Sequence, residues 1–410
     1  MTPRADGLVI SYVTMGFPMP SETFTSHDVR ELARRGAAVT VHALRPAHPA
    51  SARLTRERGL AAVTVTRARF ASLLRGVGVA ATIPAAALAL LRALVTSLWR
   101  QPELLARSLV LLPRVLEVFG EIRSRRPHVV HLCWAHYPSM VGFLVERELP
   151  GTVLSMSFSA YDIDLRYGLT AGVAQGATWL RTLSHDNVAE ICAAFGVAEW
   201  RVDVVPDGIP TRLFECRAGT RVRGRIVSVG RLDPEKGMLD VLEAFARVVA
   251  AAPYASLEVL GGGDQLPELE RRAAELGLRD VTFAGHLPQE AVAEALARAE
   301  VFLFMSLTER VPNVVKEALA AGCACVVSDT FAIRDLVPDS AHGSVVAIHD
   351  VEAAADACLR YLERSAVRTT TARAGQEWAL QHFSLDSAIS TYLVAWRAAL
   401  GTRGAVHVRD

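Results

Sequence analysis

The feature that most constrains this chain is a strand–loop–helix pattern that occurs early and restarts in the second half. An apolar run at 8–14 is followed by turn residues at 16–20, a helical pattern at 21–35 ended by Gly36, and a β-rich run at 37–44. Strand, helix and strand in this order form a βαβ unit, whose right-handed crossover makes the strands parallel. The chain is therefore expected to be an α/β protein.

The second half repeats this arrangement after a turn cluster, Pro-Asp-Gly-Ile-Pro at 206–210, and a weakly patterned segment at 211–225. Further strand-like runs are at 129–133, 152–158 and 202–205 in the first half, and at 226–229, 257–260, 281–283, 301–305 and 324–327 in the second. At 410 residues the chain is too long for one ordinary core. We predict two doubly wound, Rossmann-like domains at 1–205 and 206–385, facing each other across a cleft, and a C-terminal helix at 386–410 that can pack back on the first domain.

Residues 70–126 are helical in pattern and longer than a normal crossover, so they are expected to form an insertion. The apolar run 77–91 contains Pro84 and is shorter than the ~20 residues of a membrane-spanning helix. Two interpretations remain: helices packed on the domain, or an amphipathic patch near anionic lipid. The second would use Arg67, Arg69, Arg75, Arg92 and Arg100.

Composition narrows the class of protein. The formal charge of +1 lacks the basic field of a nucleic-acid-binding protein. The six cysteines have neither disulfide-framework nor zinc-site spacing, and the start of the chain has no secretory-signal pattern, so we expect buried thiols in the cytoplasm. Only two of the 44 basic residues are lysine, Lys236 and Lys316.

The first cluster of chemical interest is segment 230–237, Gly-Arg-Leu-Asp-Pro-Glu-Lys-Gly. It leaves a predicted strand and enters a predicted helix, and it places Arg231 and Lys236 five positions apart. Free amides at a helix N-terminus together with two cations favour an anion such as a diphosphate. The alternative is a surface loop whose charges face water.

The second cluster is segment 308–322, in which Glu309 and Glu317 are eight positions apart with Pro-Asn-Val between them. If Pro312 or Asn313 begins a helix, Glu309 lies in the preceding loop and Glu317 about one turn inside the helix. Both carboxylates can then face one cleft, with backbone amides between them for a phosphate. Taken alone, Glu317 would be an ordinary surface glutamate.

Together these motifs resemble the retaining glycosyltransferases of family 4, which have the GT-B fold. The joining segment 205–209, the glycine loop 261–263 and the segment 283–288 are also similar to segments of that family. Segment 16–24 most resembles the exopolysaccharide-biosynthesis branch.

The resemblance implies transfer of a sugar from a nucleotide-diphosphate sugar to a hydroxyl acceptor, in polysaccharide or natural-product biosynthesis. Arg231 and Lys236 would hold the diphosphate, Glu309 would orient the donor sugar, and Glu317 would bind the ribose hydroxyls. The remaining donor-side positions would be Gly16, Gly230, Pro312, Asn313 and Val314. The acceptor-side positions would be Glu22, Ser159 and Asp162.

The mechanism implied by the family is front-face attack with retention, in which the departing phosphate takes the acceptor proton. No side-chain nucleophile, metal or other cofactor is then expected. The expected partners are a nucleotide-sugar donor and a glycan, lipid-linked or small-molecule acceptor, with no nucleic acid. Contact with the inner surface of the membrane stays open.

The chain departs from the family pattern at three places. Arg310 stands where the family usually has glycine, and Ser21-Glu22 stand where many members have two glycines. Ser159 stands where histidine is common, and that histidine typically faces the donor sugar. Possible substitutes are His131, His136 and His185, each of which we interpret first as structural or on the surface.

Three other functions compete with sugar transfer. A sugar-phosphate-processing or epimerase-like enzyme of the same fold is disfavoured by the paired glutamates. A binding protein without turnover is favoured by the absence of the usual histidine at Ser159. An enzyme using NAD(P) is disfavoured because the first loop lacks the G-x-G-x-x-G pattern.

Overall fold

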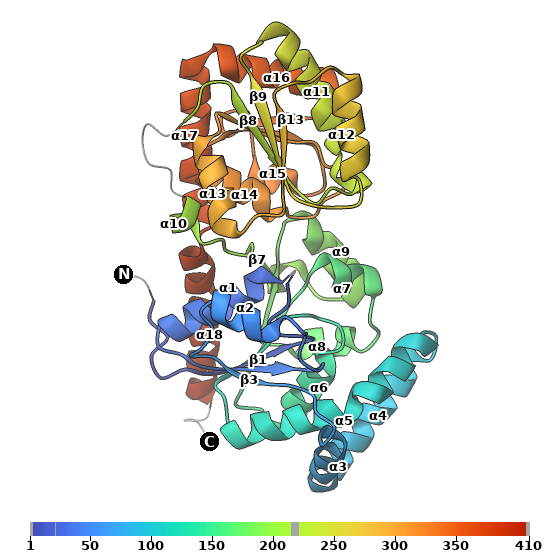
Figure 1. The fold of residues 1–410 in the computed structure, drawn as a ribbon. Helices are drawn as coiled ribbons and strands as arrows, with labels where there is room; N and C mark the ends of the chain where they lie inside the picture. Colours follow the sequence, from blue (N-terminus) through green and yellow to red (C-terminus); the bar gives the residue numbers. More distant parts are fainter. Residues whose placement is uncertain (1–2, 21, 215–220, 407–410) are drawn as a thin grey trace. The chain divides into compact units, whose positions relative to one another are not determined.

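The computed structural model describes residues 3–20, 22–214 and 221–406 as two compact units (Figure 1). One unit comprises Met1–Gly208 together with Leu385–Asp410, and the other comprises Ile209–Ser384. The first unit therefore extends past the predicted boundary at 205, and the chain returns to it at Leu385.

The first unit is built on a parallel sheet of seven strands in the order β3-β2-β1-β4-β5-β6-β7. The strands are β1 Val9–Thr14, β2 Ala38–Ala43, β3 Thr64–Thr66, β4 Val129–Leu132, β5 Val153–Ser157, β6 Trp179–Thr182 and β7 Val202–Val204. The central strands are buried on both faces, which explains why they are apolar runs rather than alternating ones.

Helices cover both faces of this sheet. One face packs against α1 Thr23–Arg34 and α18 Leu385–Val406. The other packs against α5 Pro102–Arg125, α6 Ser139–Glu148, α8 Thr170–Gly176 and α9 Asp186–Phe195. The unit also contains two short helices, α2 Ser51–Glu57 and α7 Ala160–Leu165, and a 3₁₀ turn at Glu199–Arg201. Three aromatic side chains of α18 and β6 pack together in the core in edge-to-face or tilted contacts: Trp179, Tyr392 and Trp396.

The expected insertion consists of α3 Ser72–Thr82, α4 Pro84–Leu98 and α5. The apolar run 77–91 is not one helix, because Pro84 begins a new helix after Ile83 and the two axes differ by 112°. Within the described residues, no single helix has the length and apolar character to cross a bilayer. The bent pair α3 and α4 passes that test only when the two are taken together.

The second unit has a parallel sheet of six strands in the order β10-β9-β8-β11-β12-β13. Its strands are β8 Arg225–Val229, β9 Ser256–Leu260, β10 Val281–Gly285, β11 Val301–Phe304, β12 Ala324–Ser328 and β13 Ser344–Val346. Helices α11 Met238–Ala251, α12 Leu266–Glu275 and α16 Val351–Glu363 cover one face. The other face holds α10 Thr211–Phe214, α13 Gln289–Arg298, α14 Asn313–Ala320, α15 Ile333–Leu336 and α17 Ser365–His382.

A buried polar cluster ties α1 to α18 inside the first unit. The hydroxyls of Tyr12 and Tyr392 donate to Oδ2 of Asp28 at 3.1 and 3.3 Å. Burial raises the pKa of Asp28 to about 7 because it disfavours the charged carboxylate. The guanidinium of Arg181 lies over the Tyr392 ring and donates to Asp207 at 2.7 Å.

Candidate active site

The two predicted donor clusters follow neighbouring strands. Strand order in the second sheet reverses between β8 and β11, which are paired directly. In open α/β sheets, ligands bind outside the carboxyl ends of the strands at such a reversal. The loop 230–237 follows β8 and the loop 305–312 follows β11, so the fold brings both clusters to the edge where a ligand is expected.

Glycines let the loop after β8 approach its neighbour closely. Gly261 and Gly263 lie against this loop, where a Cβ would come 1.8 Å from the carbonyl oxygen of Gly230 and 2.5 Å from that of Leu232. The amide of Leu232 donates to the carbonyl of Gly262 at 3.0 Å. The glycine loop therefore fixes the backbone that carries Arg231.

Five charged side chains form one network across the two loops. Lys236 Nζ donates to Glu309 Oε1 at 2.6 Å and lies 3.8 Å from Glu235 Oε1. Arg231 donates to the same Glu235 oxygen at 2.8 Å and also pairs with Asp233. The side chain of Lys236 is 13% exposed and that of Arg231 is 66% exposed. Arg231 is therefore open to an incoming anion, and Lys236 is held in place.

Backbone contacts lock the two loops together. The carbonyl of Glu235 accepts from the amide of Leu307 at 2.9 Å and from the hydroxyl of Ser306 at 3.1 Å. Gly237 has a φ of 61°, and a Cβ there would lie 1.9 Å from the carbonyl oxygen of Met305. Only glycine combines this positive φ with so close an approach to the Met305 carbonyl at the start of α11.

Helix α14 begins where the sequence predicted. Pro312 has extended backbone and Asn313 is the first helical residue. The Oδ1 atom of Asn313 is buried without a hydrogen-bond partner in the part of the chain that the structure describes. Glu317 is partly buried and accepts from Gln289 Nε2 at 3.0 Å, and burial raises its pKa to about 7.

The two residues beside these glutamates point elsewhere. Arg310 lies over the ring of Phe331 with its guanidinium carbon 4.6 Å from the ring centre. Lys316 is fully buried, 6.0 Å from the ring centre of Phe383. Of the two lysines, therefore, Lys236 is at the candidate site and Lys316 belongs to the core of its unit.

The predicted acceptor-side residues lie at the corresponding edge of the first sheet, where strand order reverses between β1 and β4. Gly16 is in the loop after β1, and Glu22 immediately precedes α1. One carboxylate oxygen of Glu22 is buried without a hydrogen-bond partner among the described residues, and burial raises the pKa of this group.

Ser159 and Asp162 form a capping box at the start of α7. Asp162 accepts from the Ser159 amide and hydroxyl at 2.9 and 2.8 Å, from the Ala135 amide at 2.9 Å, and from His136 Nδ1 at 2.7 Å. Asp162 thereby joins the loop after β4 to the loop after β5. The Ser159 hydroxyl is engaged in this local structure and presents no equivalent of an imidazole.

The three histidines considered as substitutes differ in their surroundings. His131 is buried, contacts Ser155 and Ser157 through its two ring nitrogens, and has a pKa far below its usual value because of burial. His185 is exposed at the start of α9. His136 is at the reversal of strand order and is oriented by Asp162, so it is the best placed of the three.

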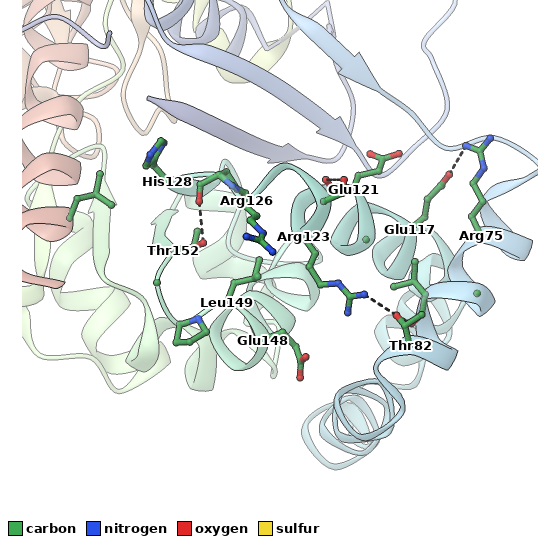
Figure 2. Close-up of a pocket in the computed structure, with 18 residues that line it drawn as sticks. Arg75, Thr82, Glu117, Glu121, Arg123, Arg126, His128, Glu148, Leu149 and Thr152 are labelled. Atoms are coloured by element: carbon green, nitrogen blue, oxygen red, sulfur yellow. Dashed lines mark hydrogen bonds and ion pairs between the residues drawn. The ribbon is translucent and has the colours of Figure 1, made fainter. Parts of the chain in front are cut away.

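A cavity of about 1190 Å³ lies at the opposite edge of the first sheet. His128 and Thr152 precede β4 and β5, and Figure 2 shows them near Arg126, with Glu148 farther along the wall of the cavity. In the same view Arg123 reaches the hydroxyl of Thr82 at 3.3 Å. These residues precede the strands, so the cavity lies at the amino ends of the strands. The candidate site lies at the carboxyl ends, so the cavity is distinct from it.

No group of three or more His, Cys, Asp or Glu side chains is arranged as a metal site within the described ranges.

Comparison with known proteins gives the family. Residues 223–378 match the profile described as "Glycosyl transferases group 1". The lipopolysaccharide core biosynthesis glycosyltransferase LpsE of Rhizobium meliloti is 31% identical over an alignment of 295 residues, which covers 68% of this chain and 85% of that protein. The chain belongs to the group 1 glycosyltransferases.

Other group 1 relatives match over a smaller part of their length. The 2-deoxystreptamine glucosyltransferase of Streptomyces kanamyceticus is 28% identical, with 55% of this chain covering 62% of that protein. The MMP alpha-(1->4)-mannosyltransferase of Mycolicibacterium hassiacum is 30% identical, with 56% of this chain covering 56% of that protein. The chain thus spans about six tenths of the length of these curated relatives.

Solved structures confirm the fold of this group 1 chain as GT-B. Anabaena Alr3699/HepE in complex with UDP matches with a TM-score of 0.71 and 15% identity, over 95% of this chain and 100% of that one. A sucrose-phosphate synthase from Thermosynechococcus elongatus matches with a TM-score of 0.64 and 17% identity, over 98% of each chain. The predicted pair of doubly wound domains is confirmed.

Three supporting residues of the group 1 site were not found from the sequence. Glu235 bridges the two cations, Ser306 fixes the loop after β11, and Gln289 donates to Glu317. Glu235 lies inside the motif and could have been found from its spacing of four from Arg231. Ser306 and Gln289 act across the fold, where sequence spacing gives no signal.

Proposed function

We propose that this chain is a retaining glycosyltransferase of family 4, closest in kind to the exopolysaccharide-biosynthesis branch. It transfers a sugar from a nucleotide-diphosphate sugar to a hydroxyl of a glycan, lipid-linked or small-molecule acceptor. The observation that carries the proposal is the Lys236–Glu309 pair beside the N-terminus of α14, at the reversal of strand order in the second sheet. The group 1 relatives support it.

In the proposed reaction, Arg231 and Lys236 neutralise the diphosphate as its bond to the anomeric carbon breaks. The acceptor oxygen forms the new bond on the same face of the sugar, and the departing phosphate takes the acceptor proton. Glu309 orients the sugar and Glu317 accepts from the ribose hydroxyls. We propose that the reaction needs no metal or other cofactor and takes place in the cytoplasm, at the inner surface of the membrane.

The test is the melting temperature of the protein with UDP-, GDP-, dTDP- and ADP-sugars, each beside its free nucleoside diphosphate. A ligand that binds only the folded state raises stability by RT ln(1 + [L]/Kd). We expect one nucleotide family to raise the melting temperature selectively. No response to any donor would contradict the proposal. Retention is then read from the anomeric configuration of the product by NMR.

A binding protein without turnover is the second candidate, and one observation favours it. The Ser159 hydroxyl is held by Asp162, so it does not replace the histidine common at this position. Selective donor binding without transfer or hydrolysis would establish this alternative. Turnover that is lost in His136→Ala and retained in His185→Ala would instead assign the histidine role to His136.

A further inference from the structure

The helices α3, α4 and α5, residues 72–125, form an arm of the first unit whose outer surface is unusually apolar. Figure 1 shows α4 and the adjoining part of α5 extending away from the sheet. Helix α4 buries one stripe of side chains against the unit: Ala86, Leu90, Leu94 and Leu98. It exposes a second apolar stripe: Leu88, Leu91 and Val95, followed by Trp99 at its end.

A helix that is apolar on every side is normally enclosed. Only one face of α4 is enclosed here, and the neighbouring helices add more exposed apolar side chains. Leu74 and Val77 of α3 and Val110 of α5 are all more than half exposed, and Phe70 just before α3 is fully exposed. An exposed patch of this kind marks a surface that binds a partner.

The charges of the arm indicate which partner. Within the arm, residues 72–125, the chain has seven arginines and three acidic residues, Glu103, Glu117 and Glu121. Arg92 and Arg100 have no ion pair within the described part of the chain, and Arg100 lies over the ring of Trp99 at 4.6 Å. Because the arm has a net positive charge, pairing it with a second copy would bring like charges together. An anionic surface is complementary to it.

We propose that the arm lies in the interface of an anionic bilayer, with its apolar side chains among the acyl chains and its arginines at the phosphate headgroups. The occupant of this surface is the membrane itself, and the arm does not span it, because α4 is anchored in the core along its buried stripe. This extends the proposed place of action and is independent of sugar transfer.

The test is sedimentation of the whole protein with phosphatidylcholine vesicles that contain or lack phosphatidylglycerol, without any donor. We expect binding only to the anionic vesicles and release by high salt. Arg92→Gln with Arg100→Gln should weaken binding by about tenfold or more, since each cation near the surface adds attraction. The control is Arg247→Gln with Arg279→Gln, two exposed arginines of the second unit, which should bind as the wild type does.

Insertion of the apolar side chains is tested with a double variant, Leu88→Gln with Trp99→Gln. The control is a second double variant, Trp200→Gln with Val394→Gln. Trp99 is 64% exposed and Trp200 is 84% exposed, so exposure alone does not separate the two pairs. We expect only the first pair to lose vesicle binding. Unchanged melting temperatures, with and without nucleotide, show that each variant is folded and keep this test separate from donor binding.

Three results would overturn the inference. They are equal binding to neutral vesicles, retention of the protein on vesicles at high salt, and formation of dimers through the arm in solution. The first would remove the role of the arginines. The second would indicate insertion of the bent helix pair. The third would identify a second copy as the occupant.

Discussion

The ammonium of Lys236 lies 2.6 Å from the carboxylate of Glu309, which joins positions 73 residues apart in the sequence. One residue belongs to the loop after β8 and the other to the loop after β11. In the free protein, therefore, the cation proposed for the diphosphate is already paired with the carboxylate proposed for the sugar.

Lys236→Ala should lower kcat/KM. The expected loss of transition-state stabilisation is ~2–4 kcal/mol, the range for loss of one charge-stabilising group. Steady-state kinetics with the donor identified by thermal shift measures this. Arg247→Ala, an exposed position on α11, is the matched control. Turnover close to wild type in Lys236→Ala would remove the lysine from the mechanism.

Glu309→Gln should separate binding from turnover. The variant removes the nearer of the two carboxylates beside Lys236, so a free nucleoside diphosphate should bind several-fold more tightly. Transfer should nevertheless fall by about 100-fold, because the donor sugar loses its orientation. Calorimetry gives the first quantity and initial rates the second. Equal losses in both would show that Glu309 serves only to hold the loop.

Donor affinity should depend on the ionisation of Glu317, whose pKa is raised to about 7 by burial. Hydroxyl donors of a ribose favour the charged carboxylate, so binding releases a proton and tightens as the pH rises through 7. We expect about a tenfold gain between pH 6 and 8. A nucleotide sugar is the suitable probe, because its diphosphate diester does not titrate in this range.

Glu317→Gln should abolish this pH dependence, whereas Glu290→Gln, at an exposed position on α13, should retain it. A pH dependence that survives in Glu317→Gln would place the titrating group elsewhere.

Asp28 should make stability fall as the pH rises. Its pKa in the folded protein is raised to about 7 from a reference value of 3.8, so the folded state holds the proton more tightly. This contribution is complete below pH 4 and is lost as the pH rises through 7. Buried His27, whose pKa is lowered to about 4, acts in the opposite direction, so the comparison must be between variants.

Asp28→Asn keeps an oxygen for the two tyrosine hydroxyls and removes the charge. Between pH 5 and 8 its free energy of unfolding should fall less than that of the wild type, by on the order of 2 kcal/mol. Urea titrations at several pH values measure this, with the exposed Asp356→Asn as control. Parallel curves for wild type and Asp28→Asn would contradict the expectation.

Gly237→Ala should destabilise the protein more than Gly277→Ala. Both glycines have positive φ, at 61° and 68°. A Cβ at Gly277 meets nothing within 4 Å, whereas one at Gly237 would collide with the carbonyl of Met305. Gly277→Ala should cost about 1 kcal/mol of backbone strain and Gly237→Ala clearly more. Equal costs would show that the two loops can separate.

The sequence was sufficient for the two domains because the long apolar strands are bounded by turn residues. Three strands were missed: Thr64–Thr66, Trp179–Thr182 and Ser344–Val346. Each has at most four residues, and Trp179–Thr182 carries Arg181, whose charge is balanced by Asp207 from beyond the next strand. Pairing of this kind depends on the assembled sheet and leaves no periodic signal in the sequence.

The candidate site could be predicted as far as its motifs extend. The structure has the loops and the helix start that the strand–loop–helix pattern predicted for Arg231, Lys236, Glu309 and Glu317. The roles of these residues stay predictions. The extent of the exposed apolar surface on the arm was harder to predict, because both stripes of α4 are apolar. Only the packed structure shows which stripe is covered.

The placement of α18 in the first unit has a consequence for biosynthesis. This unit lacks α18, one of the two helices that cover one face of its sheet, until residues 385–406 have left the ribosome. The second unit is one continuous segment and is fully synthesised before then. The usual order, in which the N-terminal domain is completed first, is therefore reversed. While translation continues, the face awaiting Tyr392 and Trp396 is the part of the nascent chain most in need of a chaperone.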